Sequence, residues 1–242
     1  MTETAGEESR FITDVEVVSA IRQDNQCLTA IQDRLVQQGI PPGKQYVDQG
    51  YMSGRHIADS LTKGIDLRGY VREGNTSKPE GFRLRDFDLA IDQRRAICPA
   101  GKKQVRWGRA TVGAQNLIAY HVGFGSQCQS CSHFGPDLCT DRPNGRHLAV
   151  SAYHDHIQAR REEADTEAFK QEMHIRAGIE GTVSEMVRSH GLRRSRFRGR
   201  RKNQLQALFI AAATNLKRLA HCSLVSVWAT VGPLHLSGAS AA

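Results

Sequence analysis

The first third of the chain alternates between two patterns of apolar residues. β-Branched residues flanked by polar ones predict strands, and apolar positions at helical spacing predict helices. Ser53 marks a helix start, and Gly39 and Gly64 mark helix ends. The resulting order is strand 10–19, helix 24–38, strand 44–47, helix 53–61 and strand 65–71, which is typical of an α/β sheet with short connections.

The pattern changes in the middle of the chain. Residues 72–143 are rich in Gly, Ser, Asn and Asp, with strand-like pieces at 82–90, 104–111 and 116–122. We interpret this part as an inserted β-rich module. Residues 148–161 then return to a strand followed by a helix.

Two longer helices follow. The first is predicted over residues 163–190, with Ile175, Ile179, Val183 and Met186 on its buried face. The second is predicted over residues 204–219. One face of this second helix is apolar and is expected to pack on the sheet; it consists of Leu205, Leu208, Phe209, Ala212, Leu216 and Leu219.

Composition narrows the class of protein. The chain has 242 residues, with 33 Lys and Arg against 25 Asp and Glu, which gives a net charge of +8. Its longest apolar run, 208–213, is too short to span a bilayer, and the glutamates of residues 1–10 argue against a secretory signal. We therefore expect a cytoplasmic protein without a membrane partner, whose six Cys are reduced thiols or metal ligands.

The positive charge is concentrated in residues 188–202, which we call the basic strip. The strip holds eight cations and no acid, and the remaining Lys and Arg equal the acids in number. Such a strip indicates a polyanion partner, because it releases counterions from a phosphate backbone; the alternative is a solvated surface. Its cations are Arg188, Arg193, Arg194, Arg196, Arg198, Arg200, Arg201 and Lys202.

Four cysteines fall in the predicted insert. Cys128 and Cys131 form a C-x2-C pair, and Cys98 and Cys139 supply two further thiols. This set predicts a closed, structural four-thiolate zinc site, with His133 as a substitute ligand. The alternative is a group of unrelated thiols. Cys27 and Cys222 lie in apolar helical settings and are expected to be core residues.

Two acids are candidates for a divalent metal site. Asp48 ends a predicted strand, and Glu180 lies on the first long helix, with Arg176 four residues earlier. A carboxylate at a sheet edge and one on a packing helix can share ions that align an oxygen with a phosphorus. Spacing alone leaves ordinary salt bridges as the alternative.

Two segments resemble a known family. The segment YVDQGYMSGRHIADSLTKGIDLRG resembles the surroundings of the second catalytic Asp of DDE-type insertion-sequence transposases. The segment RAGIEGTVSEMVRSHGLRRSRFRGRRKNQLQALFIAAATNLKRL resembles the surroundings of their final Glu. A CP-x-G at Cys98 and the C-x2-C at Cys128 are similar to a subgroup with a Cys-bearing insert.

The resemblance implies a ribonuclease H-like fold and two catalytic Mg²⁺ ions, which such enzymes use to cut and join DNA strands. Asp48 matches the second acid of the triad, Glu180 the third, and Arg176 the motif's arginine. Met173 and Val187 replace the motif's Tyr and its later basic residue, which weakens the resemblance for contacts to DNA ends but leaves Glu180 unaffected. The DNA-binding residues we expect are Arg176 and the basic strip.

The first acid of the family's triad has no match. The chain begins just before strand 10–19, and Asp14 on that strand corresponds to no catalytic position. The expectation is a ribonuclease H-like fold lacking its first strands, from a truncated or split transposase whose activity alone is uncertain. Partners would be DNA and either further copies of the chain or the product of an adjacent reading frame.

Two functions remain open at this point. One is DNA transposition by metal-dependent phosphoryl transfer, and the other is a non-catalytic zinc- and DNA-binding fragment or regulator. A fragment that does not fold stably alone is a third outcome. The expected organisation is a disordered N-terminus at 1–10, a first part of the DDE domain at 11–71, the Cys-bearing insert at 72–147, the helical C-terminal part at 148–220 and a tail at 221–242.

Overall fold

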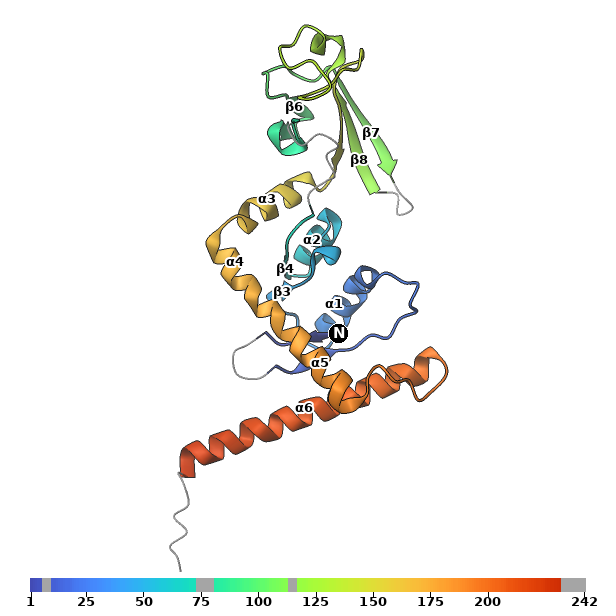
Figure 1. Ribbon diagram of the computed structural model, residues 1–242, viewed down its shortest axis with the longest axis vertical. Helices are drawn as coiled ribbons and strands as arrows, with labels where there is room; N and C mark the ends of the chain where they lie inside the picture. Colours follow the sequence, from blue (N-terminus) through green and yellow to red (C-terminus); the bar gives the residue numbers. More distant parts are fainter. Residues whose placement is uncertain (6–9, 73–80, 113–116, 232–242) are drawn as a thin grey trace, which may run out of the picture. The chain divides into compact units, whose positions relative to one another are not determined.

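The computed structural model describes residues 1–5, 10–72, 81–112 and 117–231 (Figure 1). It divides into a terminal unit, Met1–Tyr46 with Gln171–Ala242, and a Cys-bearing unit, Val47–Lys170, and each is described by itself. Both contain helices and strands, which confirms the mixed α/β class. Parts of the predicted N-terminus, insert and tail (6–9, 73–80, 113–116 and 232–242) lie outside the described residues.

The terminal unit begins with a small antiparallel ribbon. β1 (Thr2–Glu3) pairs with β2 (Ile12–Asp14), and Thr4 N donates to Phe11 O at 2.8 Å. The structure thus differs from the expected disordered N-terminus at these residues, because β1 satisfies backbone groups along one edge of β2. The predicted strand 10–19 shortens to the three residues of β2.

A helix and a short strand follow in the same unit. A 3-10 turn, η1 (Asp24–Cys27), leads into α1 (Leu28–Gln37), and β3 (Lys44–Tyr46) comes next. Cys27 is buried with Ile31 and Leu35, which confirms it as a core residue. The buried amides of Gln32 and Gln45 bond to each other at 2.8 Å, so α1 and β3 are joined by a satisfied polar contact.

The predicted helix 163–190 is broken into separate pieces. α3 (His154–Ala164) ends, α4 (Glu167–Met173) and the 3-10 turn η5 (His174–Ala177) follow, and α5 (Gly178–His190) completes the segment. The break has a local cause: the hydroxyl of Thr166 donates to Glu163 O at 2.7 Å and accepts from Phe169 N at 3.3 Å. Thr166 therefore caps a new helix within the apolar pattern.

The last helix, α6 (Arg200–Val231), is longer than predicted and packs through a different face from the predicted one. Its buried residues Ala207 and Ala211 join Ile12, Val15 and Met186 in the core of the terminal unit. The expectation that the apolar face packs on the sheet is wrong: Leu205, Leu208, Phe209, Leu216 and Leu219 are all exposed, as is Ala212.

The polar face of α6 packs inward because β2 and the residues just after it offer backbone groups that need partners. Gln204 accepts from Val17 N at 2.7 Å and donates to Val15 O at 2.6 Å. Asn215 makes the corresponding pair of bonds with Ile12. Satisfying these buried groups requires side-chain amides, which the apolar face lacks.

The Cys-bearing unit contains two small antiparallel sheets around one core. A hairpin of two short strands packs beside a three-stranded sheet whose order is β7-β8-β9. Phe87, Ala96, Val122, Phe124 and Val150 are buried between them. The strands are β5 (Asp88–Ala90), β6 (Arg95–Ile97), β7 (Arg106–Val112), β8 (Leu117–Gly123) and β9 (His147–Ser151), with β4 (Asp66–Arg68) nearer the start and 3-10 turns η2 (Gln49–Tyr51), η3 (Leu84–Asp86) and η4 (Gly125–Cys128).

A short helix, α2 (Gly54–Leu61), lies against α3 in this unit. The Ser53 hydroxyl caps it by accepting from His56 N at 3.1 Å, as the sequence predicts. Gly54 lies so close to α3 that a Cβ there would approach Tyr153 Cβ to 2.5 Å. The helix pair therefore requires glycine at this contact.

Candidate functional site

Asp48 lies in the Cys-bearing unit, directly after β3 along the chain. It has extended backbone (φ −69°, ψ 157°), and its carbonyl accepts from Tyr51 N at 2.9 Å to begin η2. Its side chain is exposed, so its carboxylate is accessible to an ion from solvent. The strand-to-turn position matches the expected one.

Glu180 lies in the first turn of α5 in the terminal unit and is exposed. The predicted buried face is confirmed only in part: Met186 is buried as predicted, together with Thr182, whereas Ile175 and Val183 are exposed. Glu180 nevertheless points away from the core, and Arg176 precedes it in η5. Asp48 and Glu180 belong to different units. That they bind the same metal ions therefore remains a prediction.

Neighbouring acids of the terminal unit are held in ion pairs. Glu185 accepts from Lys217 at 2.9 Å and from Arg218 at 2.8 Å, and these hydrogen bonds lower the pKa of its carboxyl. Glu172 accepts from Lys44 at 2.6 Å and from Tyr46 at 2.7 Å. Glu180 makes no side-chain hydrogen bond or ion pair within the described residues, which distinguishes it from these structural carboxylates.

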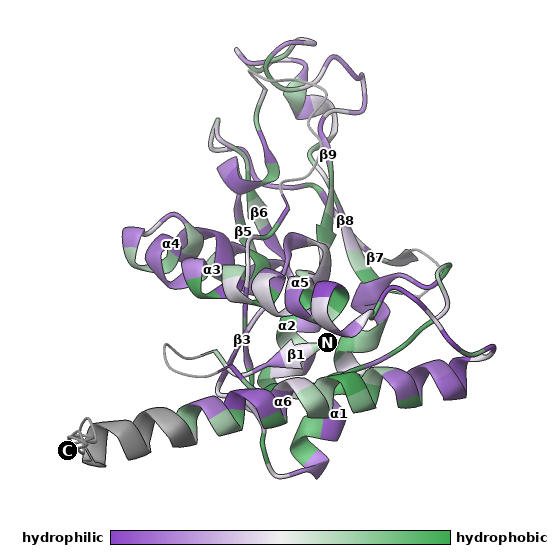
Figure 2. Ribbon diagram, turned by 60° about the horizontal axis from the view of Figure 1, so that its bottom comes forward, coloured by the Kyte–Doolittle hydropathy of each residue, from purple (hydrophilic) through white to green (hydrophobic). Residues whose placement is uncertain are grey.

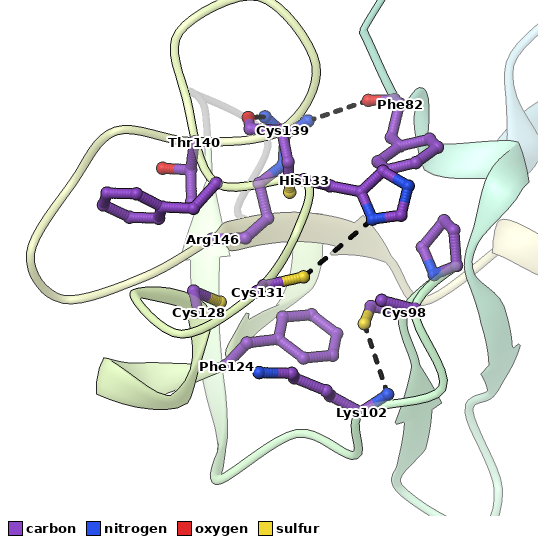
Figure 3. Close-up of a pocket in the computed structure, with 13 residues that line it drawn as sticks. Phe82, Cys98, Lys102, Phe124, Cys128, Cys131, His133, Cys139, Thr140 and Arg146 are labelled. Atoms are coloured by element: carbon purple, nitrogen blue, oxygen red, sulfur yellow. Dashed lines mark hydrogen bonds between the residues drawn. The ribbon is translucent and has the colours of Figure 1, made fainter.

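The four cysteines of the predicted zinc site line one pocket in the Cys-bearing unit (Figure 3). Cys128 closes η4, and its carbonyl accepts from Cys131 N at 3.0 Å in a tight turn. Cys139 lies beyond them, where Arg146 donates to its carbonyl at 2.9 Å. Three separate chain segments thus bring Cys98, Cys128, Cys131 and Cys139 to the same pocket.

Cys98 starts a turn that places one backbone hydrogen-bond donor at its sulfur. Gly101 N donates to Cys98 O at 2.8 Å, and Lys102 N donates to Cys98 Sγ at 3.3 Å. Gly101 has a φ of +77°, which favours glycine. A backbone N–H group that donates to a cysteine sulfur is a contact that orients this sulfur when it serves as a metal ligand.

Two cations and one histidine also line this pocket. The Lys102 ammonium donates to Gln127 O, and Arg146 lies beside Cys139. His133 Nδ1 is 4.0 Å from Cys131 Sγ. Burial raises the pKa of the Cys139 thiol, while Arg146 acts in the opposite direction. Sequence reasoning missed Lys102 and Arg146, although the lysine follows CPAG directly.

The thiols are not arranged as a ligand set. Within the described part of the chain, no three His, Cys, Asp or Glu side chains are grouped so that they could hold a metal ion. The described cysteines form no disulfide, so the four thiols are free. The zinc site therefore remains a prediction.

The basic strip runs from the last turn of α5 through a loop into the first turn of α6. All eight of its cations are exposed, and none forms an ion pair with another described residue. The loop itself is ordered by amides: Gln206 accepts from Arg196 N at 3.1 Å and donates to Arg194 O at 3.0 Å. Arg200, Arg201 and Lys202 lie at a helix N-terminus, where positive charge opposes the helix dipole.

Comparison with protein families identifies the class. A family model described as the transposase DDE domain matches residues 97–220, just over half of the chain. The chain belongs to this family, which confirms the resemblance and implies a ribonuclease H-like fold and a role in DNA transposition. The match includes Glu180, the four pocket cysteines and the basic strip, whereas Asp48 lies outside it.

Other comparisons add no relatives. No curated protein and no solved structure matches this chain. Among the described residues, no helix has the length and apolar character needed to cross a membrane.

Proposed function

We propose that this chain acts in DNA transposition by binding duplex DNA through the basic strip and presenting Asp48 and Glu180 to catalytic Mg²⁺. The observation that carries the proposal is the set of eight exposed cations, without ion-pair partners among the described residues, that directly follows the helix of Glu180. Arginine forks can hold two phosphate oxygens at once. DNA bound along the strip would therefore pass close to Glu180.

The two carboxylates fit a magnesium site in their chemistry. Mg²⁺ takes oxygen ligands, and both side chains are accessible from solvent. When bound, the ions would activate the attacking oxygen and stabilise the leaving one. The chain's own contribution is to present Asp48 and Glu180 as ligands and to hold the phosphate backbone with the arginines.

We further propose that Cys98, Cys128, Cys131 and Cys139 hold one structural Zn²⁺. Thiolates are the ligands that zinc prefers in closed sites, and four of them leave no open position for catalysis. The N–H donor at Cys98 and the cations Lys102 and Arg146 would offset the negative charge of four thiolates. Ion binding requires the thiols to turn toward one another from their present positions.

A second candidate is a non-catalytic zinc- and DNA-binding module that regulates transposition. The observation that favours it is the extent of the family match, which leaves Asp48 outside. The two candidates predict the same DNA affinity but differ in metal dependence. Mg²⁺-dependent nicking of DNA from the ends of the transposable element would support the catalytic candidate. Glu180→Gln should abolish this nicking, and Glu162→Gln should retain it.

DNA affinity tests the shared part of the proposal. Fluorescence anisotropy of a labelled duplex, titrated over a range of salt, gives a log-log slope of about 0.9 per phosphate contact. We expect Arg193, Arg194, Arg196 and Arg198 changed together to Ala to lower affinity for all duplexes alike and to flatten the slope.

The matched control is a second quadruple variant that removes four positive charges outside the basic strip. Lys103, Arg106, Arg109 and Arg142 are exposed in the Cys-bearing unit, so changing them to Ala alters the net charge equally. The control should keep most of the affinity and slope. If both quadruple variants weaken binding to the same extent, net charge rather than the strip accounts for binding.

A further inference from the structure

One face of α6 is apolar and uncovered in the terminal unit. Leu205 is 54% exposed, Phe209 67% and Leu216 66%, and Leu208, Ala212 and Leu219 complete this apolar seam. At about 100° per residue the seam is centred about 110° around the helix from the face that packs on β2. Figure 2 shows apolar residues along the middle of α6.

A seam of this kind indicates a protein contact. Single exposed apolar residues are ordinary, but a contiguous set of large ones on one helix face marks an interaction site. The core cluster of the terminal unit contains none of the seam residues. The apolar area of the seam therefore stays exposed in the terminal unit and is available to a binding partner.

Apart from Phe209, whose counterpart position holds Asn215, the seam is symmetric about Ala212, its smallest residue. Leu208 and Leu216 lie four residues on either side of Ala212, and Leu205 and Leu219 lie seven on either side. In an antiparallel pair about a two-fold axis at Ala212, positions equally far before and after Ala212 face each other, so each of these contacts joins two Leu and occurs twice. Ala212 at the centre also allows the two helix axes to approach to about 8 Å.

The charges of α6 determine the direction of pairing. The helix contains no Asp or Glu, and Arg200, Arg201 and Lys202 begin it. Parallel pairing would place two such clusters side by side. Antiparallel pairing about Ala212 separates them by about 30 Å at 1.5 Å per residue, which is several Debye lengths at physiological salt. Lys217 and Arg218 are already paired with Glu185.

We propose that α6 pairs with α6 of a second copy of this chain, antiparallel, about a two-fold axis at Ala212. Leu205 then contacts the partner's Leu219, and Leu208 contacts the partner's Leu216. The pairing buries the seam and leaves the basic strips at opposite ends of the helix pair. It is independent of whether the strip binds DNA.

Cysteine cross-linking tests the axis. At the two-fold axis the two Cα atoms come within the range of about 4.4–6.8 Å that a disulfide requires. We expect Ala212→Cys in a Cys222→Ser background to form a covalent dimer under mild oxidation. Ala213→Cys in the same background is the control, since Ala213 is equally small and exposed but about 100° away. Equal cross-linking of both variants, or of neither, overturns the proposal.

Charged substitutions in the seam test the register, with the oligomeric state measured by light scattering after size-exclusion chromatography. Leu208→Glu alone should give a monomer, because two carboxylates enter an apolar contact. Leu208→Glu with Leu216→Lys should restore the dimer, since each Glu then faces a Lys of the other copy. A parent chain that stays monomeric at high concentration contradicts the proposal and would leave another protein segment as the cover. A double variant that stays monomeric rejects the register.

Discussion

Asn215 of α6 makes two hydrogen bonds to one residue, Ile12 of β2: its Oδ1 accepts from Ile12 N and its Nδ2 donates to Ile12 O, both at 2.8 Å. The side-chain amide of Asn215 thus binds both backbone groups of a residue more than 200 positions away, in the same way that a residue of a neighbouring strand would. The contact fixes which face of α6 packs on the ribbon. It also explains why the apolar seam is left uncovered.

Loss of this contact should destabilise the terminal unit. Asn215→Ala leaves a donor and an acceptor of the buried residue Ile12 unsatisfied, and we expect a loss of about 1–3 kcal/mol in the free energy of unfolding. Urea denaturation measures it. Asn144→Ala, on an exposed loop, should leave stability within about 0.5 kcal/mol. Equal stability of the two variants would show that α6 does not depend on these bonds.

Helix ends were easier to predict from the sequence than the contacts between distant segments. Ser53 caps α2, and Gly191 ends α5 with a φ of +64°, because both signals act within one turn of the chain. The packing face of α6 could not be predicted, since an apolar seam indicates burial without naming its partner. The role of Asn215 depends on a strand about 200 residues away. Thr166 divided a helix whose apolar pattern is continuous.

For the candidate sites, too, the sequence identified some of the residues but not their surroundings in the fold. Spacing singled out the cysteines, and the structure places all four at one pocket, but the roles of Lys102 and Arg146 depend on folding. The basic strip was evident from charge alone. Asp48 and Glu180 needed the family resemblance, because single acids at element ends are common in any α/β protein.

Stability should depend on pH through Glu185. Its pKa is lowered from 4.5 by hydrogen bonds from Lys217 and Arg218, so its contribution is present above the unfolded pKa and is lost as pH falls through the folded pKa. Glu185→Gln should therefore be less stable than the parent near neutral pH and equal to it in strong acid. Thermal unfolding from pH 7 to pH 3 measures the difference. Glu162→Gln is the control, and a gap that persists unchanged at pH 3 contradicts the ion-pair explanation.

Two glycine substitutions should act in opposite directions. Gly54→Ala would bring a Cβ to 2.5 Å from Tyr153 Cβ and 3.0 Å from Tyr153 O, so α2 and α3 must move apart, and we expect destabilisation. Gly181→Ala lies within α5, where a Cβ meets no atom within 4 Å, and should stabilise the helix by up to about 1 kcal/mol. Denaturant midpoints give both signs. Gains in both variants would refute the close helix contact at Gly54.

The zinc proposal predicts stoichiometric metal in protein purified without added zinc. Four thiolates from separate segments bind one ion tightly, and the ion should then stabilise the Cys-bearing unit, because the unfolded chain offers no formed site. Cys128→Ser with Cys131→Ser should abolish zinc, measured by mass spectrometry, and lower the melting temperature of that unit. Cys222→Ser, which removes a thiol of the other unit, should change neither. Zinc near zero in the parent, or unchanged in the double variant, would reject the assignment. Removal of zinc from the parent protein by a chelator should lower the melting temperature as the double substitution does. Readdition of zinc should restore the parent protein but not the double variant.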